Sequence, residues 1–149
     1  MDEHARRSGG RAPGMSTRDC PFCRVIAGEL AGEILDEDER TIAFMASEPA
    51  TRGHALVVPR CHAPDLLGIA DDDLAAAVAG AMRLAARAVD RLGADGVNVI
   101  NGCGRAAWQT VPHFHIHVIP RYAGDQLRLA LRSPSAGPED IAAVAAVLR

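Results

Sequence analysis

Three histidines alternate with apolar residues in the segment His113-Phe114-His115-Ile116-His117. Successive side chains of a β-strand point to opposite faces, so this pattern predicts a strand with all three imidazoles on one face. Because a strand rises about 3.3 Å per residue, neighbouring imidazoles should lie roughly 6.6–7 Å apart and line a groove rather than converge on one ion. The chain has only six histidines, so the grouping indicates a functional strand. A solvent-facing edge strand is the alternative.

The remaining sequence predicts one α+β domain, since 149 residues suffice for a single buried core. Apart from the histidine segment, strands are expected over residues 33–38, 41–46, 53–60 and 97–101, and helices over 20–28, 71–92 and 138–148. The strands cluster into hairpins, which favours an antiparallel sheet of about five strands with a long helix and a shorter helix packed beside it. The long helix carries a stripe of apolar residues at helical spacing, namely Leu74, Val78, Met82, Leu84, Ala85 and Val89.

Residues 1–17 are predicted to form a disordered tail, because the first fourteen are rich in glycine, arginine and proline. Residues 18–149 then form the domain. The tail has no apolar segment of the kind found in secretory signals, and no run in the chain approaches the ~18 apolar residues of a membrane span. We therefore expect a cytoplasmic protein whose four cysteines are thiols or metal ligands.

The overall charge argues against some partner classes. A formal net charge of −3 provides no electrostatic basis for binding nucleic acid or an anionic membrane. Any phosphate group must therefore be held by a few local donors.

Cys20 and Cys23 are separated by two residues at the start of a predicted helix. Such a pair can supply two ligands of a tetrahedral zinc site, and His62 and His113 are the candidates to complete it. A thioredoxin-like redox motif has the same spacing, but no βαβ pattern surrounds this one. Two packed free thiols are the other alternative.

The loop from Asn101 to Thr110 precedes the histidine segment. It contains two glycines, which let the backbone approach a ligand closely, and the uncharged hydrogen-bonding side chains of Asn101, Gln109 and Thr110. The loop could hold phosphate oxygens, or it could be an ordinary turn. His54, at the start of an apolar strand, is by itself more typical of a structural residue.

These segments together resemble the histidine triad (HIT) family, and within it the small bacterial nucleotide hydrolases and transferases. The resemblance covers about residues 20 to 125. It rests on several motifs in order: Cys20-Pro-Phe-Cys23, Ala43-Phe44, Pro49, Arg52-Gly-His54, Val58-Pro-Arg60, His62, Asn101-x-x-Gly104, Gln109-Thr-Val111 and His113 to Arg121.

The resemblance implies cleavage of a nucleoside phosphoramidate or a dinucleoside polyphosphate at the α-phosphate, through a covalent nucleotidyl-histidine intermediate. His115 takes the position of the nucleophile, a role that suits a neutral imidazole with an ordinary pKa of ~6.5. By the same resemblance, His117 and Gln109 stabilise the charge on the phosphate and His54 supports the site. The alternative function is a nucleotide-binding regulatory module with weak or lost catalysis.

The resemblance also implies ligands and assembly. The residues implied to bind a purine nucleotide or nucleotide conjugate are Phe44, Asn101, Gln109, Thr110, His115 and His117. The residues implied to coordinate one structural zinc ion per chain are Cys20, Cys23, His62 and His113. Such a site has no open position, so metal-assisted hydrolysis is not expected, and a catalytic metal bound by the histidines is a third interpretation. Members are homodimers, and we expect a homodimer here.

Two positions depart from the family pattern. Ala46 stands where members usually carry an acidic residue near the ribose, which favours weaker nucleotide binding or a different substrate. Trp108 stands where a glycine often precedes the glutamine, and its bulk would narrow the phosphate loop or close over the base.

Overall fold

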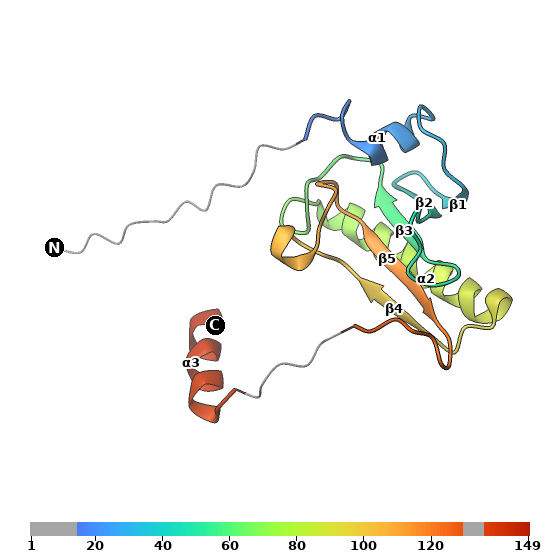
Figure 1. The fold of residues 1–149 in the computed structure, drawn as a ribbon. Coiled ribbons are helices and arrows are strands. Elements are labelled where there is room, and N and C mark those ends of the chain that lie inside the picture. Colours follow the sequence, from blue (N-terminus) through green and yellow to red (C-terminus); the bar gives the residue numbers. More distant parts are fainter. Residues whose placement is uncertain (1–14, 130–135) are drawn as a thin grey trace.

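The computed structural model describes residues 15–129 and 136–149 and shows an α+β fold built on a five-stranded sheet (Figure 1). The strand order is β1-β2-β3-β5-β4, and every neighbouring pair is antiparallel. The strands are β1 (Ile34–Glu37), β2 (Thr41–Met45), β3 (Ala55–Pro59), β4 (Gly96–Ile100) and β5 (Ile116–Arg121). The helices are α1 (Pro21–Ile26), α2 (Asp71–Leu92), the 3-10 turn η1 (Arg105–Ala107) and α3 (Pro138–Leu148). The predicted fold class is confirmed, whereas residues 1–14 of the predicted tail lie outside the described residues.

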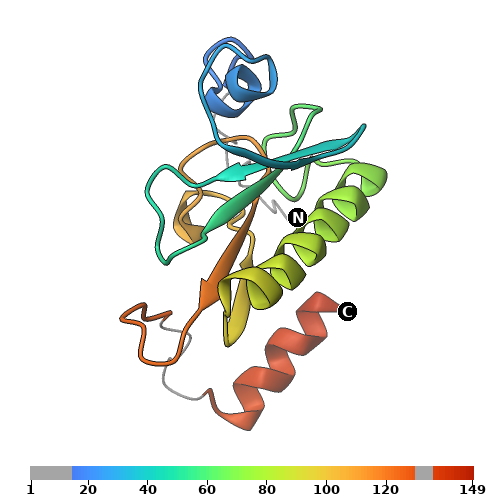
Figure 2. The same ribbon diagram turned by 90° about the vertical axis from the view of Figure 1, so that its right-hand side faces the viewer.

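Helix α2 covers one face of the sheet (Figure 2). It approaches the strands through small residues, and a Cβ added at Gly80 would lie only 3.0 Å from Cγ1 of Val57. Three residues of the apolar stripe on this helix do not face the sheet, because Val78, Met82 and Val89 are 53%, 68% and 48% exposed. Ala77, Ala81, Leu84 and Ala88 form the buried side of the helix instead.

The other face of the sheet carries helix α1 and the histidines. Phe22 and Val25 of α1 pack on Phe44 and Leu56 from the central strands, and the rings of Phe22 and Phe44 meet edge to face at 5.6 Å. The sheet therefore separates two apolar cores, one under each helix.

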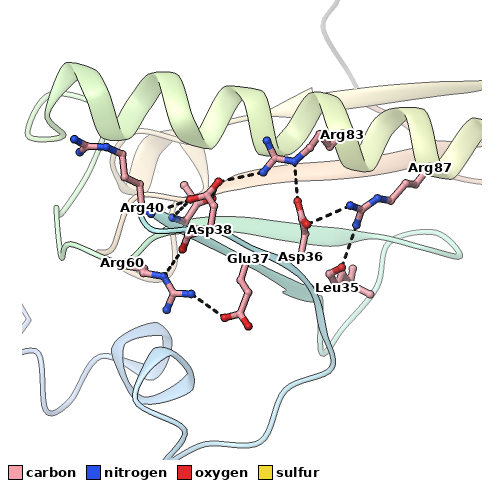
Figure 3. Close-up of polar contacts among 9 residues, drawn as sticks. Leu35, Asp36, Glu37, Asp38, Arg40, Arg60, Arg83 and Arg87 are labelled. Carbon is pink, nitrogen blue, oxygen red and sulfur yellow. Dashed lines mark hydrogen bonds and ion pairs between the residues drawn. The ribbon is translucent and has the colours of Figure 1, made fainter.

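Ion pairs fasten strand β1 to helix α2 (Figure 3). Arg83 Nε donates to Asp36 at 2.8 Å, and Arg87 Nη2 donates to the other carboxylate oxygen at 3.1 Å. Burial alone would raise the pKa of Asp36, but the two guanidinium groups outweigh this effect and hold the pKa below its usual value. We call these three residues the arginine clamp.

Helix α3 has the predicted bounds but buries none of its side chains in the described chain. Ile141, Val144, Val147 and Leu148 are between 51% and 85% exposed. An isolated helix of 11 residues is marginal in water, so α3 needs an apolar surface to pack on. Among the described residues, no helix is both long and apolar enough to span a membrane.

Candidate functional site

The histidine segment is a strand only from Ile116 onward, so the prediction of a strand through all three histidines is wrong for the first two. The backbone there bonds outside the sheet: the amide of Phe114 donates to the carbonyl of Ala63 at 2.7 Å. The alternation itself is confirmed, since Phe114 and Ile116 lie in the core under α2. His115 and His117 point to the opposite face, with ring centroids 4.9 Å apart.

His113 belongs to a cluster with Cys20, Cys23 and His62, whose ligand atoms all lie within 4.8 Å of one another. His113 Nδ1 is 3.4 Å from Cys20 Sγ, 3.5 Å from Cys23 Sγ and 3.1 Å from His62 Nδ1. Zinc bond lengths of about 2.0–2.3 Å place tetrahedral ligand atoms roughly 3.3–3.8 Å apart. The four residues therefore have the composition and nearly the spacing of a structural zinc site, and they are the four predicted ligands.

The surroundings of this cluster also suit a cation. His113 Nε2 donates to the carbonyl of Pro59 at 2.8 Å, which leaves Nδ1 as the ligand atom. Burial lowers the pKa of His113 to about 4, so its ring is neutral, as metal binding requires. Burial and the adjacent Cys20 thiol raise the pKa of Cys23 to about 11, so a pair of thiolates here needs a compensating positive charge. Without a metal the Cys23 thiol is therefore neutral at pH 7, and a bound cation would supply the charge that stabilises its thiolate.

His115 uses its nitrogens in the opposite way. Its Nδ1 lies 2.8 Å from the carbonyl of His113 and therefore carries the proton, because a carbonyl can only accept. Burial lowers the pKa of His115, so the ring is neutral and the lone pair is on Nε2. Asn101 Nδ2 donates to the carbonyl of His115 at 2.9 Å and fixes the backbone at this position.

A hydrogen-bonded chain sets the proton on His117. The amide of Ala50 donates to His54 Nδ1 at 3.0 Å, so the proton of His54 is on Nε2. That Nε2 lies 2.9 Å from His117 Nδ1 and donates to it, which leaves the proton of His117 on Nε2. Burial, with His115 and His54 nearby, lowers the pKa of His117 to about 4, consistent with a neutral ring. Two histidines on one face thus present a lone pair and an N–H.

Both rings line a cavity of about 170 Å³ that also contains His54 and Gln109. The structure therefore brings together all four side chains that sequence analysis assigned to catalysis. The other lining residues are Ile100, Gly102, Ala107, Trp108, Ile119 and Leu129. We call this space the histidine cavity. A larger cavity of about 390 Å³ on the α2 face, between Leu35 and Arg91, contains none of the histidines.

Gln109 holds the loop with its whole amide group. Its Oε1 accepts from the amide of Gly104 at 2.8 Å, and its Nε2 donates to the carbonyls of Pro64 and Val111 at 2.6 and 3.1 Å. In this arrangement Gln109 positions the loop beside the cavity, and its amide hydrogens point to backbone carbonyls.

The remaining predicted nucleotide residues occupy different surroundings. Thr110 is exposed next to Gln109, and Phe44 is buried in the core under α1, outside the cavity lining. Among the described residues, Asn101 Oδ1 is the one buried side-chain oxygen without a hydrogen-bond partner.

Sequence reasoning missed the backbone groups that set the protons, the carbonyls of Pro59 and His113 and the amide of Ala50. It also missed the apolar wall of the cavity, which Ile100, Ile119 and Leu129 form. The alternation of side chains along β4 and β5 places Ile100 and Ile119 on the histidine face and could have identified them. Leu129 follows the last strand, and no sequence pattern marks it.

Comparisons with known proteins agree with this geometry. A family model described as the HIT domain matches residues 27–124. An uncharacterised HIT-like protein of Methanocaldococcus jannaschii is 41% identical over 106 residues, which cover 71% of this chain and 81% of the relative. A zinc-bound histidine triad family protein from Mycobacterium smegmatis has a solved structure with a TM-score of 0.73 and 37% identity, covering 80% of this chain and 86% of its own. The solved structure of a histidine triad nucleotide-binding protein from Candida albicans gives a TM-score of 0.76 at 28% identity. The match covers 87% of this chain and 94% of the Candida chain.

Proposed function

The chain belongs to the HIT family, and on this basis we propose that it is a nucleotidyl hydrolase or transferase that cleaves a nucleoside phosphoramidate or a dinucleoside polyphosphate at the α-phosphate. The observation that carries the proposal is the pair of opposite tautomers at the histidine cavity. His115 offers the lone pair of Nε2, and His117 offers an N–H two residues away.

In the first step, Nε2 of His115 attacks the α-phosphorus, and a P–N bond to the imidazole forms as the bond to the leaving group breaks. The leaving nitrogen or oxygen takes up any proton it needs from solvent. The imidazole becomes cationic, and its Nδ1–H is already bonded to the carbonyl of His113, which stabilises that charge. In the second step, water or another acceptor attacks phosphorus, the P–N bond breaks, neutral His115 returns and the acceptor's proton passes to solvent.

His117 supports this reaction as a hydrogen-bond donor to a phosphate oxygen. Its Nε2–H is held in place by the bond from His54, so no reorganisation is needed as negative charge develops. Asn101 keeps the backbone of His115 in position by donating to its carbonyl.

The metal cluster has a structural role in this proposal. Zinc, when bound, supplies a cross-link and no catalysis, since four protein ligands leave no coordination position open. The four ligands connect three segments of the chain: Cys20 and Cys23 lie at the start of α1, His62 follows β3, and His113 lies two residues before the nucleophile His115.

We further propose that the protein works as a homodimer. Strand β4 is an edge of the sheet, Val99 on it is 53% exposed, and the exposed α2 residues Val78, Met82 and Val89 form an adjoining apolar surface. Exposed apolar surface beside a strand edge is typical of an interface between copies. Light scattering tests this: the parent protein should be twice the mass of the chain, and Met82→Glu combined with Val99→Asp should yield monomers.

The function itself is tested by mixing the protein with an adenosine phosphoramidate, quenching rapidly and mapping peptides by mass spectrometry. The expected result is adenylylation of His115 in the parent protein and its absence in His115→Ala. Turnover without a trapped adduct, and with His115→Ala fully active, would refute the mechanism.

The alternative is a nucleotide-binding regulatory module, and Ala46 is the observation that favours it, because this position carries no carboxylate to bind a ribose. Calorimetry distinguishes the two functions. Micromolar nucleotide binding without turnover of a phosphoramidate or a diadenosine polyphosphate would establish the module.

A further inference from the structure

Trp108 has a backbone conformation that its side chain disfavours. Its φ is +65°, and it is the one non-glycine residue with positive φ among those the structure describes. Left-handed backbone brings the Cβ of an L-residue close to the following carbonyl oxygen, so glycine is the residue that suits this position. The indole is also 78% exposed, so core packing does not explain its presence.

The loop holds Trp108 in one place. The amide of Trp108 donates to the carbonyl of Arg105 at 3.0 Å, and the amide of Gln109 donates to the carbonyl of Gly104 at 3.2 Å. At Gly102 the loop closes so tightly that an added Cβ would clash with the carbonyl oxygen of Ala107. The indole therefore stands on a fixed loop at the edge of the histidine cavity.

The cavity beside Trp108 is apolar. Ile100, Ile119 and Leu129 line it together with the indole and with His115 and His117. Among the residues that the structure describes, no arginine or lysine lines it. Further phosphate groups of a polyphosphate would find no permanent positive charge on this wall, whereas an apolar group would be desolvated favourably.

The wall lies on the β4 side of the histidines. Strand β2, which contains Phe44 and ends just before Ala46, lies on the other side of β5. A nucleotide bonded to His115 has one group on each side of the reacting phosphorus. By the family resemblance the ribose lies near Ala46, which follows β2 on that other side, and a nucleoside placed there leaves the leaving group against Trp108.

We propose that Trp108 is a specificity-determining residue that stacks on a planar ring in the leaving group. The preferred substrates are nucleoside phosphoramidates whose amine carries an aromatic ring. This inference rests on the proposed function and selects among its substrates: ring-bearing amines are favoured over small alkyl amines and over polyphosphates.

The test compares two adenosine 5′-phosphoramidates, one of 2-phenylethylamine and one of propylamine. The measured quantity is the ratio of their kcat/KM values in the parent protein, in Trp108→Gly and in Trp108→Phe. Because stacking of a ring on an aromatic side chain is worth about one order of magnitude in binding, Trp108→Gly should lower this ratio about tenfold. Trp108→Phe should retain most of the ratio, and Arg105→Ala, an exposed change in the same loop, should leave it unchanged.

Melting temperatures distinguish recognition from a structural role. Glycine relieves the left-handed backbone, so Trp108→Gly should melt at the same temperature as the parent or higher. A lower melting temperature with equal losses on both substrates would make Trp108 structural and overturn the inference. An unchanged ratio with full turnover would overturn it as well, while leaving the proposed function intact. If the parent cleaves neither substrate, the inference fails; if it also leaves a diadenosine polyphosphate intact and no adduct forms on His115, the proposed function fails with it.

Discussion

His113 and His115 are two residues apart and chemically identical, yet their surroundings give them different chemistry. His113 donates from Nε2 to the carbonyl of Pro59 and turns Nδ1 toward two thiols and a second imidazole. His115 donates from Nδ1 to the carbonyl of His113 and leaves Nε2 for a cavity. In each case a backbone carbonyl selects which nitrogen stays free, and the neighbours of that nitrogen decide between a metal ligand and a nucleophile.

The sharpest way to break this comparison is His115→Ala. Losing the covalent nucleophile should lower kcat for a phosphoramidate by ~10³-fold or more, which is about 4 kcal/mol of transition-state stabilisation. The same variant should still bind one zinc per chain, measured by atomic absorption. Loss of zinc in His115→Ala would show that the two histidines do not act separately.

The converse change is Cys20→Ser, at a fully buried ligand of the metal cluster. Removing a structural metal ligand should abolish the bound zinc and lower the melting temperature by about 10 °C or more, since lost metal sites are among the largest single destabilisations. Cys61→Ser, at an exposed cysteine outside the cluster, is the matched control and should change neither quantity. A zinc content of one per chain in Cys20→Ser would refute the ligand assignment.

His54→Ala should have a smaller effect, because His54 acts through His117. Without the donor to His117 Nδ1, the tautomer of His117 is no longer fixed, and kcat should fall by roughly 10²-fold. His54→Gln keeps an N–H donor and should recover part of that loss. Equal activities of the two variants would indicate that His54 contributes packing alone.

The smallest effect belongs to the arginine clamp, which touches neither histidine. Because the pKa of Asp36 is lowered in the folded protein, its contribution to stability is present above the unfolded pKa of about 4 and is lost as the pH falls through the folded value. Asp36→Asn should therefore lower the free energy of unfolding by about 1 kcal/mol at pH 7 and by less at pH 3. Urea titrations at both pH values measure this, and zinc content and kcat should stay constant.

Local patterns in the sequence sufficed for the order of elements and for the pairing of Cys20 with Cys23, whereas the full set of four metal ligands came from the resemblance to the HIT family. Alternation around Phe114 and Ile116 predicted the sheet face correctly, and the bounds of α2 agree with the prediction. The exposed side of α2 was not predictable in this way, because Gly80 decides how closely the helix approaches Val57. A hydropathy pattern records which residues are apolar, whereas burial depends on which of them the sheet can reach.

The catalytic assignment needed contacts between distant residues. Nothing in the local sequence shows that the amide of Ala50 orients His54, or that His54 in turn fixes the proton of His117. Gln109 illustrates the same limit: its type suits a phosphate donor, but its amide hydrogens are engaged by the carbonyls of Pro64 and Val111.

Trp108 is the sole tryptophan of the chain and stands at the rim of the histidine cavity. Its intrinsic fluorescence therefore reports on the cavity and hardly at all on the cores under α1 and α2. Emission should already resemble that of a water-exposed indole in the folded protein and shift little on denaturation, so circular dichroism is the better monitor of unfolding. A bound ligand should quench or shift the emission directly, which gives a label-free titration of the site.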